Sequence, residues 1–118
     1  MLTNYTTHCI VLCIRRYWMD IQLKKGLLDL MVLATIKYED SYGYKIIQEI
    51  SSVMDISEST LYPILKRLEK QKLVNTYNTT YNSRIRKYYQ INKQGLEKLK
   101  QSIDDFDEIN RMYMYIKR

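Results

Sequence analysis

The fold is decided by residues 57–69, which read SESTLYPILKRLE. The first four of these residues are rich in side-chain oxygens, which can cap the free amides at the start of a helix. Three leucines then recur at the i, i+4, i+7 spacing of a helix with one buried face. They are Leu61, Leu65 and Leu68. The stretch therefore predicts an amphipathic helix that runs to about residue 71.

Pro63 limits where this helix can begin. With Thr60 as the N-cap, the proline falls at the third helical position, where its missing N–H is not needed. A cap at Ser57 would instead require a missing backbone hydrogen bond or a kink. The sequence therefore favours a start at Thr60.

A short amphipathic helix is also predicted upstream, over residues 43–54, where isoleucines fall on one stripe. The second helix of this pair carries Lys66 and Arg67 on its predicted outer face. Two helices joined by a short turn are typical of a helix-turn-helix, whose second helix reads DNA. The ordinary alternative is that the two basic residues belong to a solvated helix face.

The segment that follows is basic and has the composition of a β-hairpin. Residues 70–96 contain six Lys and Arg side chains and no acid, which is the pattern of an electrostatic footprint for nucleic acid. Residues 74–79 and 86–91 are rich in β-branched and aromatic residues, and residues 81–84 form the predicted turn. A hairpin directly after a helix-turn-helix is a wing, whose tip can lie along a neighbouring groove or phosphate run.

Two segments carry more apolar surface than one small domain can cover. Residues 23–36 are apolar on nearly every side. A long last helix, predicted over residues 93–116 with Asn92 as its cap, carries apolar residues at alternating spacings of three and four. We therefore expect a homodimer in which the last helix packs against the first helix of a second subunit. The expected interface residues are Leu27, Leu30, Met31, Leu96, Leu99, Ile103, Phe106, Ile109 and Tyr113.

Residues 1–18 differ in character from the rest of the chain. They hold both cysteines and the only histidine, within HCIVLC at residues 8–13, but three such ligands do not close a tetrahedral zinc site. We therefore expect reduced thiols and no metal. The apolar run at residues 9–14 is too short for a bilayer span and does not have the order of a secretory signal. We expect no membrane partner and a cytoplasmic protein. We also expect the native start to lie at Met19, with residues 1–18 either upstream sequence outside the native protein or a loosely attached N-terminal extension.

Length and composition exclude several classes of protein. The 118 residues suffice for one compact domain, and the net charge of +6 is consistent with an acidic partner such as DNA. Three glycines leave no glycine-rich phosphate loop. Outside residues 1–18 the sequence offers no Cys–His, Ser–His–Asp or metal cluster, so we expect neither an enzyme nor a cofactor. A winged helix used only for protein contacts is the alternative from another class.

Over residues 21–108 the chain resembles the PadR-like transcriptional regulators, a winged helix-turn-helix family. The resemblance lies in Leu27-Leu28, Tyr42-Gly43-Tyr44, Thr60-Leu61-Tyr62-Pro63, Leu65-Lys66-Arg67-Leu68-Glu69, Arg86-Lys87-Tyr88-Tyr89 and Gly95. Members usually carry Gly where this chain has Gln71 or Lys72, and Pro or Gly in the wing where it has Asn82-Ser83. The single helix after the wing is similar to the short-tailed subfamily, in which that helix alone dimerises.

The resemblance implies a mainly α fold with a small β-hairpin: an extension at 1–18, a winged helix-turn-helix domain at 19–91 and a dimerisation helix at 92–118. It implies a regulator of transcription that binds a double-stranded DNA operator, a repressor released by a small aromatic effector. The expected DNA contacts are Tyr42, Tyr44, Ser59, Thr60, Tyr62, Lys66, Arg67, Arg84, Arg86 and Lys87. For Tyr42 and Tyr44 we expect a packed ring with the hydroxyl toward phosphate, whereas Thr60 could act only as a cap and Tyr62 only in the core. The expected effector contacts are Phe106, Met112 and Tyr113, for which dimer packing is the alternative.

Overall fold

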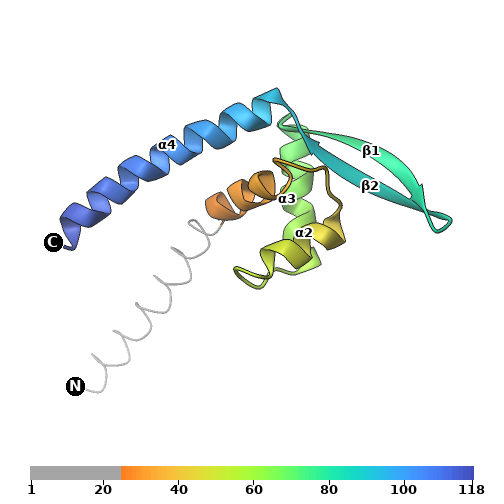
Figure 1. The fold of residues 1–118 in the computed structure, drawn as a ribbon, viewed down its shortest axis with the longest axis horizontal. Helices are drawn as coiled ribbons and strands as arrows, with labels where there is room; N and C mark the ends of the chain where they lie inside the picture. Colours follow the sequence, from red (N-terminus) through yellow and green to blue (C-terminus); the bar gives the residue numbers. More distant parts are fainter. Residues whose placement is uncertain (1–24) are drawn as a thin grey trace, which may run out of the picture.

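The computed structural model describes residues 25–118, so the predicted extension at residues 1–18, with its cysteines and histidine, lies outside the described residues. Residues 25–35 are helical and precede the labelled elements. These are α2 (Gly43–Ile50), α3 (Glu58–Lys70), β1 (Val74–Tyr81), β2 (Arg84–Ile91) and α4 (Lys93–Ile116). Figure 1 shows the hairpin on one side of the three shorter helices and α4 running away on the other. The predicted fold class, a mainly helical winged helix-turn-helix followed by one long helix, is confirmed.

The core lies where the 25–35 helix, α2 and α3 meet. Each of the three contributes residues that are almost fully removed from solvent, which is the expected result of their amphipathic spacing. The most buried side chains are Val32, Leu33, Ile36, Ile46, Leu61, Leu65 and Leu68. The hairpin adds Val74 and Tyr89 to the same cluster, so the base of the wing is part of the core.

The start of α3 differs from the sequence prediction. Its N-cap is Ser57, whose hydroxyl accepts a hydrogen bond from the backbone N–H of Thr60. Pro63 therefore lies inside the helix and leaves the carbonyl of Ser59 without its helical donor. Ser59 is exposed at this end of the helix, so water can satisfy that carbonyl, and the missing bond costs less than it would in a buried helix.

The end of α3 explains why a glycine is usual there. Lys72 has a φ of 60°, in the left-handed region that favours glycine. The N–H of Leu73 donates to the carbonyl of Leu68 and that of Lys72 to the carbonyl of Glu69, both at 3.0 Å. This pair of bonds is a Schellman motif, so the chain turns into the wing as it would with glycine, but with a lysine in a strained conformation.

The wing is a regular antiparallel hairpin with a two-residue turn. Its register pairs Val74 with Ile91 at the base and Tyr81 with Arg84 at the tip. Asn82 and Ser83 have φ values of 48° and 63°, the positive values at both central positions that a type I′ turn requires. The strands are longer than the sequence predicted, because only these two residues leave the ladder.

The segment before α2 attaches to the base of the wing. The N–H of Ser41 donates to the carbonyl of Tyr89 at 3.1 Å, and the N–H of Tyr89 donates back at 2.7 Å. The helix that follows ends at Ile50 rather than near residue 54. The hydroxyl of Ser51 bonds back to the carbonyl of Ile47, a local interaction that competes with continued helix.

The long helix α4 starts as the sequence predicts. The side chain of Asn92 accepts a hydrogen bond from the N–H of Gly95 at 2.9 Å. A Cβ on Gly95 would collide with the backbone carbonyl of Leu73, so glycine permits α4 to approach the start of the wing. Among residues 25–118 no helix has both the length and the apolar character needed to cross a membrane.

Candidate nucleic-acid interface

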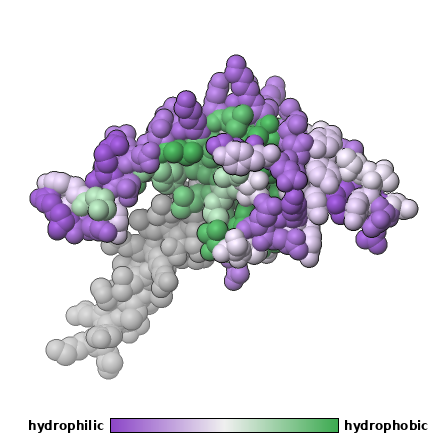
Figure 2. All heavy atoms as spheres, viewed as in Figure 1, coloured by the Kyte–Doolittle hydropathy of each residue, from purple (hydrophilic) through white to green (hydrophobic). Residues whose placement is uncertain are grey.

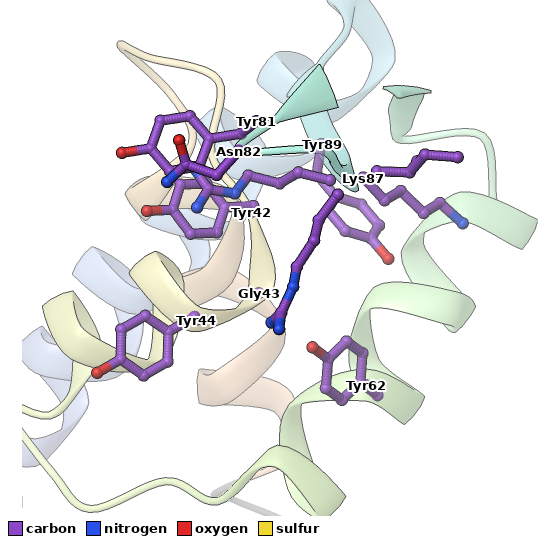
Figure 3. Close-up of a pocket in the computed structure, with 11 residues that line it drawn as sticks. Tyr42, Gly43, Tyr44, Tyr62, Tyr81, Asn82, Lys87 and Tyr89 are labelled. Carbon is purple, nitrogen blue, oxygen red and sulfur yellow. The ribbon is translucent and has the colours of Figure 1, made fainter. Parts of the chain in front are cut away.

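A cleft of about 700 Å³ lies between α2, the start of α3 and the wing. Figure 3 shows labelled tyrosines from these elements around it, with Tyr44 and Tyr62 on the helix side and Tyr81 on the wing. Arg84, Arg86 and Lys87 also line the cleft, and no acidic residue among residues 25–118 does. A concave surface with three cations, several tyrosine hydroxyls and no carboxylate fits a polyanion.

Gly43 brings α2 and α3 together on the floor of this cleft. A Cβ at this position would lie 2.7 Å from the hydroxyl oxygen of Tyr62, closer than a Cβ can approach without displacing the ring. The Tyr62 ring therefore packs over the first turn of α2, yet 48% of the residue remains exposed. The neighbouring Tyr44 is 60% exposed, so the prediction that its ring is packed is wrong.

The exposed start of α3 carries the predicted hydroxyl residues. The hydroxyls of Ser59 and Thr60 lie 2.9 and 3.1 Å from the hydroxyl of Ser57, so all three form one small cluster at the helix end. Lys66, two turns along the same helix, is exposed. It forms no ion pair with another described residue, which leaves its charge available to a partner.

The sequence predicted Arg67 on the open outer face of α3, but in the structure it does not lie there. Its guanidinium makes two hydrogen bonds to the carboxylate of Asp29 on the 25–35 helix, one of them from Nε to Oδ2 at 3.3 Å. Both side chains are partly buried. The charge of Arg67 is therefore neutralised within the protein, because residue 67 lies one position around the helix from Lys66 and faces the neighbouring helix.

The three basic residues of the wing have different surroundings. Arg84 at the tip is exposed and pairs with no described carboxylate. The ammonium of Lys87 lies 3.2 Å from a carboxylate oxygen of Glu69 on α3, and this hydrogen bond raises the pKa of Lys87. The guanidinium of Arg86 lies over the ring of Tyr42 at 3.9 Å and over the ring of Tyr81 at 4.2 Å from the ring centres.

Several residues of the cleft were missed by the sequence analysis. Tyr81, Asn82, Ile85 and Tyr89 line it beside the predicted residues. The alternation of side chains along β1 and β2 could have indicated some of them, since residues two apart on a strand share a face. The turn predicted at residues 81–84 already pairs Tyr81 with Arg84, as the structure does, so this signal could have indicated Tyr81.

A second hollow, of about 460 Å³, lies between the 25–35 helix and α4 on the far side from the wing. Figure 2 shows apolar residues gathered beneath α4 in this region. Of the predicted dimer residues, those that line this hollow are Leu27, Leu30, Met31, Leu99, Ile103 and Phe106. Leu96, Ile109 and Tyr113 do not line it, and each is more than 40% exposed along α4.

Leu99 is an exception among these residues. It is only 5% exposed and belongs to the core of a single chain, so its burial does not require a second subunit. The three predicted effector residues are also not gathered in one place. Phe106 lines the hollow, whereas Met112 and Tyr113 lie further along α4 and are 55% and 53% exposed.

Comparison with known proteins identifies the family. Residues 32–101 match the model of the transcriptional regulator PadR-like family. An uncharacterized protein of Lysinibacillus sphaericus is 34% identical over 93 residues, which cover 75% of this chain and 85% of the relative.

Two solved structures show the same architecture. A PadR family transcriptional regulator from Eggerthella lenta has a TM-score of 0.77 and 26% identity, and the match covers 91% of this chain and 96% of that one. Bacillus subtilis PadR in complex with operator DNA has a TM-score of 0.61 and 21% identity, over 65% of this chain and 45% of that one, and supports the fold alone. Since the family model covers more than half of the chain and most of the described winged helix, this protein belongs to the PadR-like family of transcriptional regulators.

Proposed function

We propose that the protein is a dimeric, sequence-specific DNA-binding repressor that binds its operator through the cleft between α2, α3 and the wing. The single observation that supports this proposal is the composition of that cleft, which is lined by three cations and by no carboxylate of the part of the chain that the structure describes. A neutral or mixed surface would serve a protein partner equally well, but a one-signed concave surface favours a phosphate backbone. A cytoplasmic location is part of the proposal.

The side chains of the cleft and of the N-terminal end of α3 are proposed to make different kinds of contact with DNA. Lys66 and Arg84 are the proposed phosphate contacts, because neither is paired with a described carboxylate. Ser59 and Thr60, at the exposed N-terminal end of α3, are short enough to meet base edges when α3 enters the major groove. Tyr44 can direct its exposed hydroxyl to a phosphate from α2.

The dimer is proposed to form through the 25–35 helix and α4. Leu27 and Ile103, which line the hollow between these two helices, are 39% and 48% exposed in the single chain and so offer apolar surface for a partner to cover. A second α4 packed along this surface would remove them from water. A two-fold dimer would also present two copies of α3 to two half-sites of one operator.

A small aromatic effector is proposed to bind between the terminal helices of the dimer, beside Phe106. The support is the apolar hollow that Phe106 lines in the single chain. Binding there would disturb the contact between α4 and the 25–35 helix, and hence the spacing of the two recognition helices.

The salt dependence of binding to a short random-sequence duplex tests the DNA interface. Lys66→Ala and Arg84→Ala should each reduce the slope of log affinity against log salt by about one, because each removes one phosphate contact. Lys100→Ala, an exposed charge on α4 away from the cleft, is the control and should leave the slope unchanged. A full chain that does not bind the duplex, or whose binding does not depend on salt, would instead support a winged helix used for protein contacts.

A further inference from the structure

Arg86 holds an unusual place in the cleft. Its guanidinium lies between two tyrosine rings from different elements, Tyr42 just before α2 and Tyr81 at the end of β1. Figure 3 shows the rings of Tyr42 and Tyr81 near one another on this side of the cleft. The guanidinium carbon therefore lies within cation–π distance of two rings of the protein itself, and each ring attracts the cation.

The stack continues from Arg86 toward the base of the wing. The rings of Tyr42 and Tyr88 meet edge to face with their centroids 5.4 Å apart, and Tyr88 stacks on Tyr77 with their centroids 5.5 Å apart and the planes 8° apart. The hydroxyl of Tyr77 then donates to the carboxylate of Asp40 at 2.5 Å. We call these residues, with Arg86 and Tyr81, the wing column.

The wing column joins the wing to the segment before α2. The opposite face of the hairpin is tied to α3, where Glu69 accepts hydrogen bonds from Thr76 at 3.4 Å and Lys87 at 3.2 Å. Thr76 lies in the half of the hairpin nearer the core, and Lys87, paired with Asn78, lies just past its middle, whereas Arg86 and Tyr81 lie closer to the tip. Among the described hydrogen bonds, ion pairs and ring contacts that join the wing to the helices, the contact of Arg86 with Tyr42 is therefore the one nearest the tip.

We propose that Arg86 is a positioning residue, which sets the angle of the wing toward α2 and so places Arg84 on the DNA, and that it is not itself a phosphate contact. The guanidinium of Arg86 bridges two neutral rings of the protein, those of Tyr42 and Tyr81. The effect on DNA rests on the proposed function, whereas the effect on the wing does not.

The first test needs no DNA. Amide hydrogen exchange of the full chain is measured for residues 79–86. Arg86→Leu and Tyr81→Leu should each speed exchange there several-fold, because either change removes part of the stack while keeping a residue that suits a strand. Tyr81→Phe keeps the ring and should exchange like the unaltered protein, and so should Arg84→Ala. Unchanged exchange in Arg86→Leu would overturn the proposal.

The second test is a double-mutant cycle on a random-sequence duplex. Arg86→Leu and Tyr81→Leu should weaken binding by a similar factor of about ten, or about 1.4 kcal/mol, although Tyr81→Leu removes no charge. Arg84→Ala should weaken binding less in the Arg86→Leu background than alone, because the tip is already displaced.

Two results of the cycle would contradict a positioning role. They are Tyr81→Leu binding like the unaltered protein, and additive effects of Arg84 and Arg86 with a salt slope reduced by about one for each. Absence of any binding by the unaltered chain would contradict the proposed function, and the exchange measurements would still decide the role of Arg86.

Discussion

Arg67 on α3 is hydrogen-bonded to Asp29 on the 25–35 helix, through both its Nε and a terminal nitrogen. The pair joins the predicted recognition helix to the helix whose other side lines the hollow beneath α4. Because the two side chains are only partly exposed, loss of one partner leaves the other in a poorly solvated place. These hydrogen bonds to Asp29 indicate that Arg67 stabilises and orients α3.

Asp29→Asn should therefore lower the free energy of unfolding by about 1 to 2 kcal/mol, measured by urea denaturation, because Arg67 loses its charged acceptor. Arg67→Met added to Asp29→Asn should cost less than the sum of the two single changes. Glu39→Gln is the matched control, since Glu39 pairs with Lys45 at the surface at 3.4 Å, and it should change stability by less than about 0.5 kcal/mol. Equal effects of Asp29→Asn and Glu39→Gln would show that the Arg67–Asp29 pair contributes no more to the free energy of unfolding than a surface ion pair does.

The proposed dimer predicts a single change that separates the subunits. Ile103→Lys places a charge in the middle of the surface formed by the 25–35 helix and α4, and light scattering should then report a monomer at micromolar concentration. Ile85→Lys is the control, because Ile85 is 77% exposed on the wing, outside that surface, and it should leave the dimer intact. A folded monomer from the unaltered full chain at the same concentration would contradict the dimer.

Lys72→Gly should stabilise the protein by about 1 kcal/mol, because glycine adopts the left-handed φ at this position without steric cost. Lys70→Gly is the matched control, since Lys70 is the last residue of α3 with ordinary helical geometry, and it should destabilise by about 1 kcal/mol. Chemical denaturation of both variants measures whether each change raises or lowers the free energy of unfolding. A loss of stability in Lys72→Gly would mean that the lysine side chain contributes more than the backbone strain costs.

The wing column predicts a late-titrating tyrosine. The hydrogen bond to Asp40 raises the pKa of Tyr77 from 10.0 to about 12, so the folded protein favours the protonated hydroxyl. The stabilisation from this bond is fully present below pH 10 and is lost as the pH rises through about 12. Absorbance of tyrosinate during a base titration should show a component near pH 12 that Tyr77→Phe removes and Asp40→Asn shifts to lower pH. A titration unchanged by Tyr77→Phe would contradict this bond.

Local sequence patterns predicted the elements because each element is specified by neighbouring residues. The Asn92 cap, the hairpin around Asn82 and Ser83, and the apolar stripe of α3 all depend on spacings of a few residues. The error at the start of α3 came from treating Pro63 as decisive, whereas an exposed helix end tolerates one missing bond.

The roles of side chains were predicted less well, because they depend on contacts between distant parts of the chain. Arg67 finds Asp29 at a separation of 38 residues, and neither residue alone indicates the pair. Leu99 is used by the core of its own chain rather than by a partner, a distinction that requires knowing where α4 packs. The sequence predicted Arg86 as a DNA-binding cation of the wing, whereas in the structure its guanidinium lies over the rings of Tyr42 and Tyr81.

Selection of bound sequences from a pool of random double-stranded DNA tests the central claim most directly. A dimer that presents two copies of α3 should enrich an inverted repeat whose half-sites lie about one helical turn, or a multiple of one turn, apart. The combined variant Lys66→Ala, Arg84→Ala should enrich the same repeat weakly or not at all. A pool that remains random after selection with the unaltered full chain would contradict the account of this protein as a sequence-specific DNA-binding regulator.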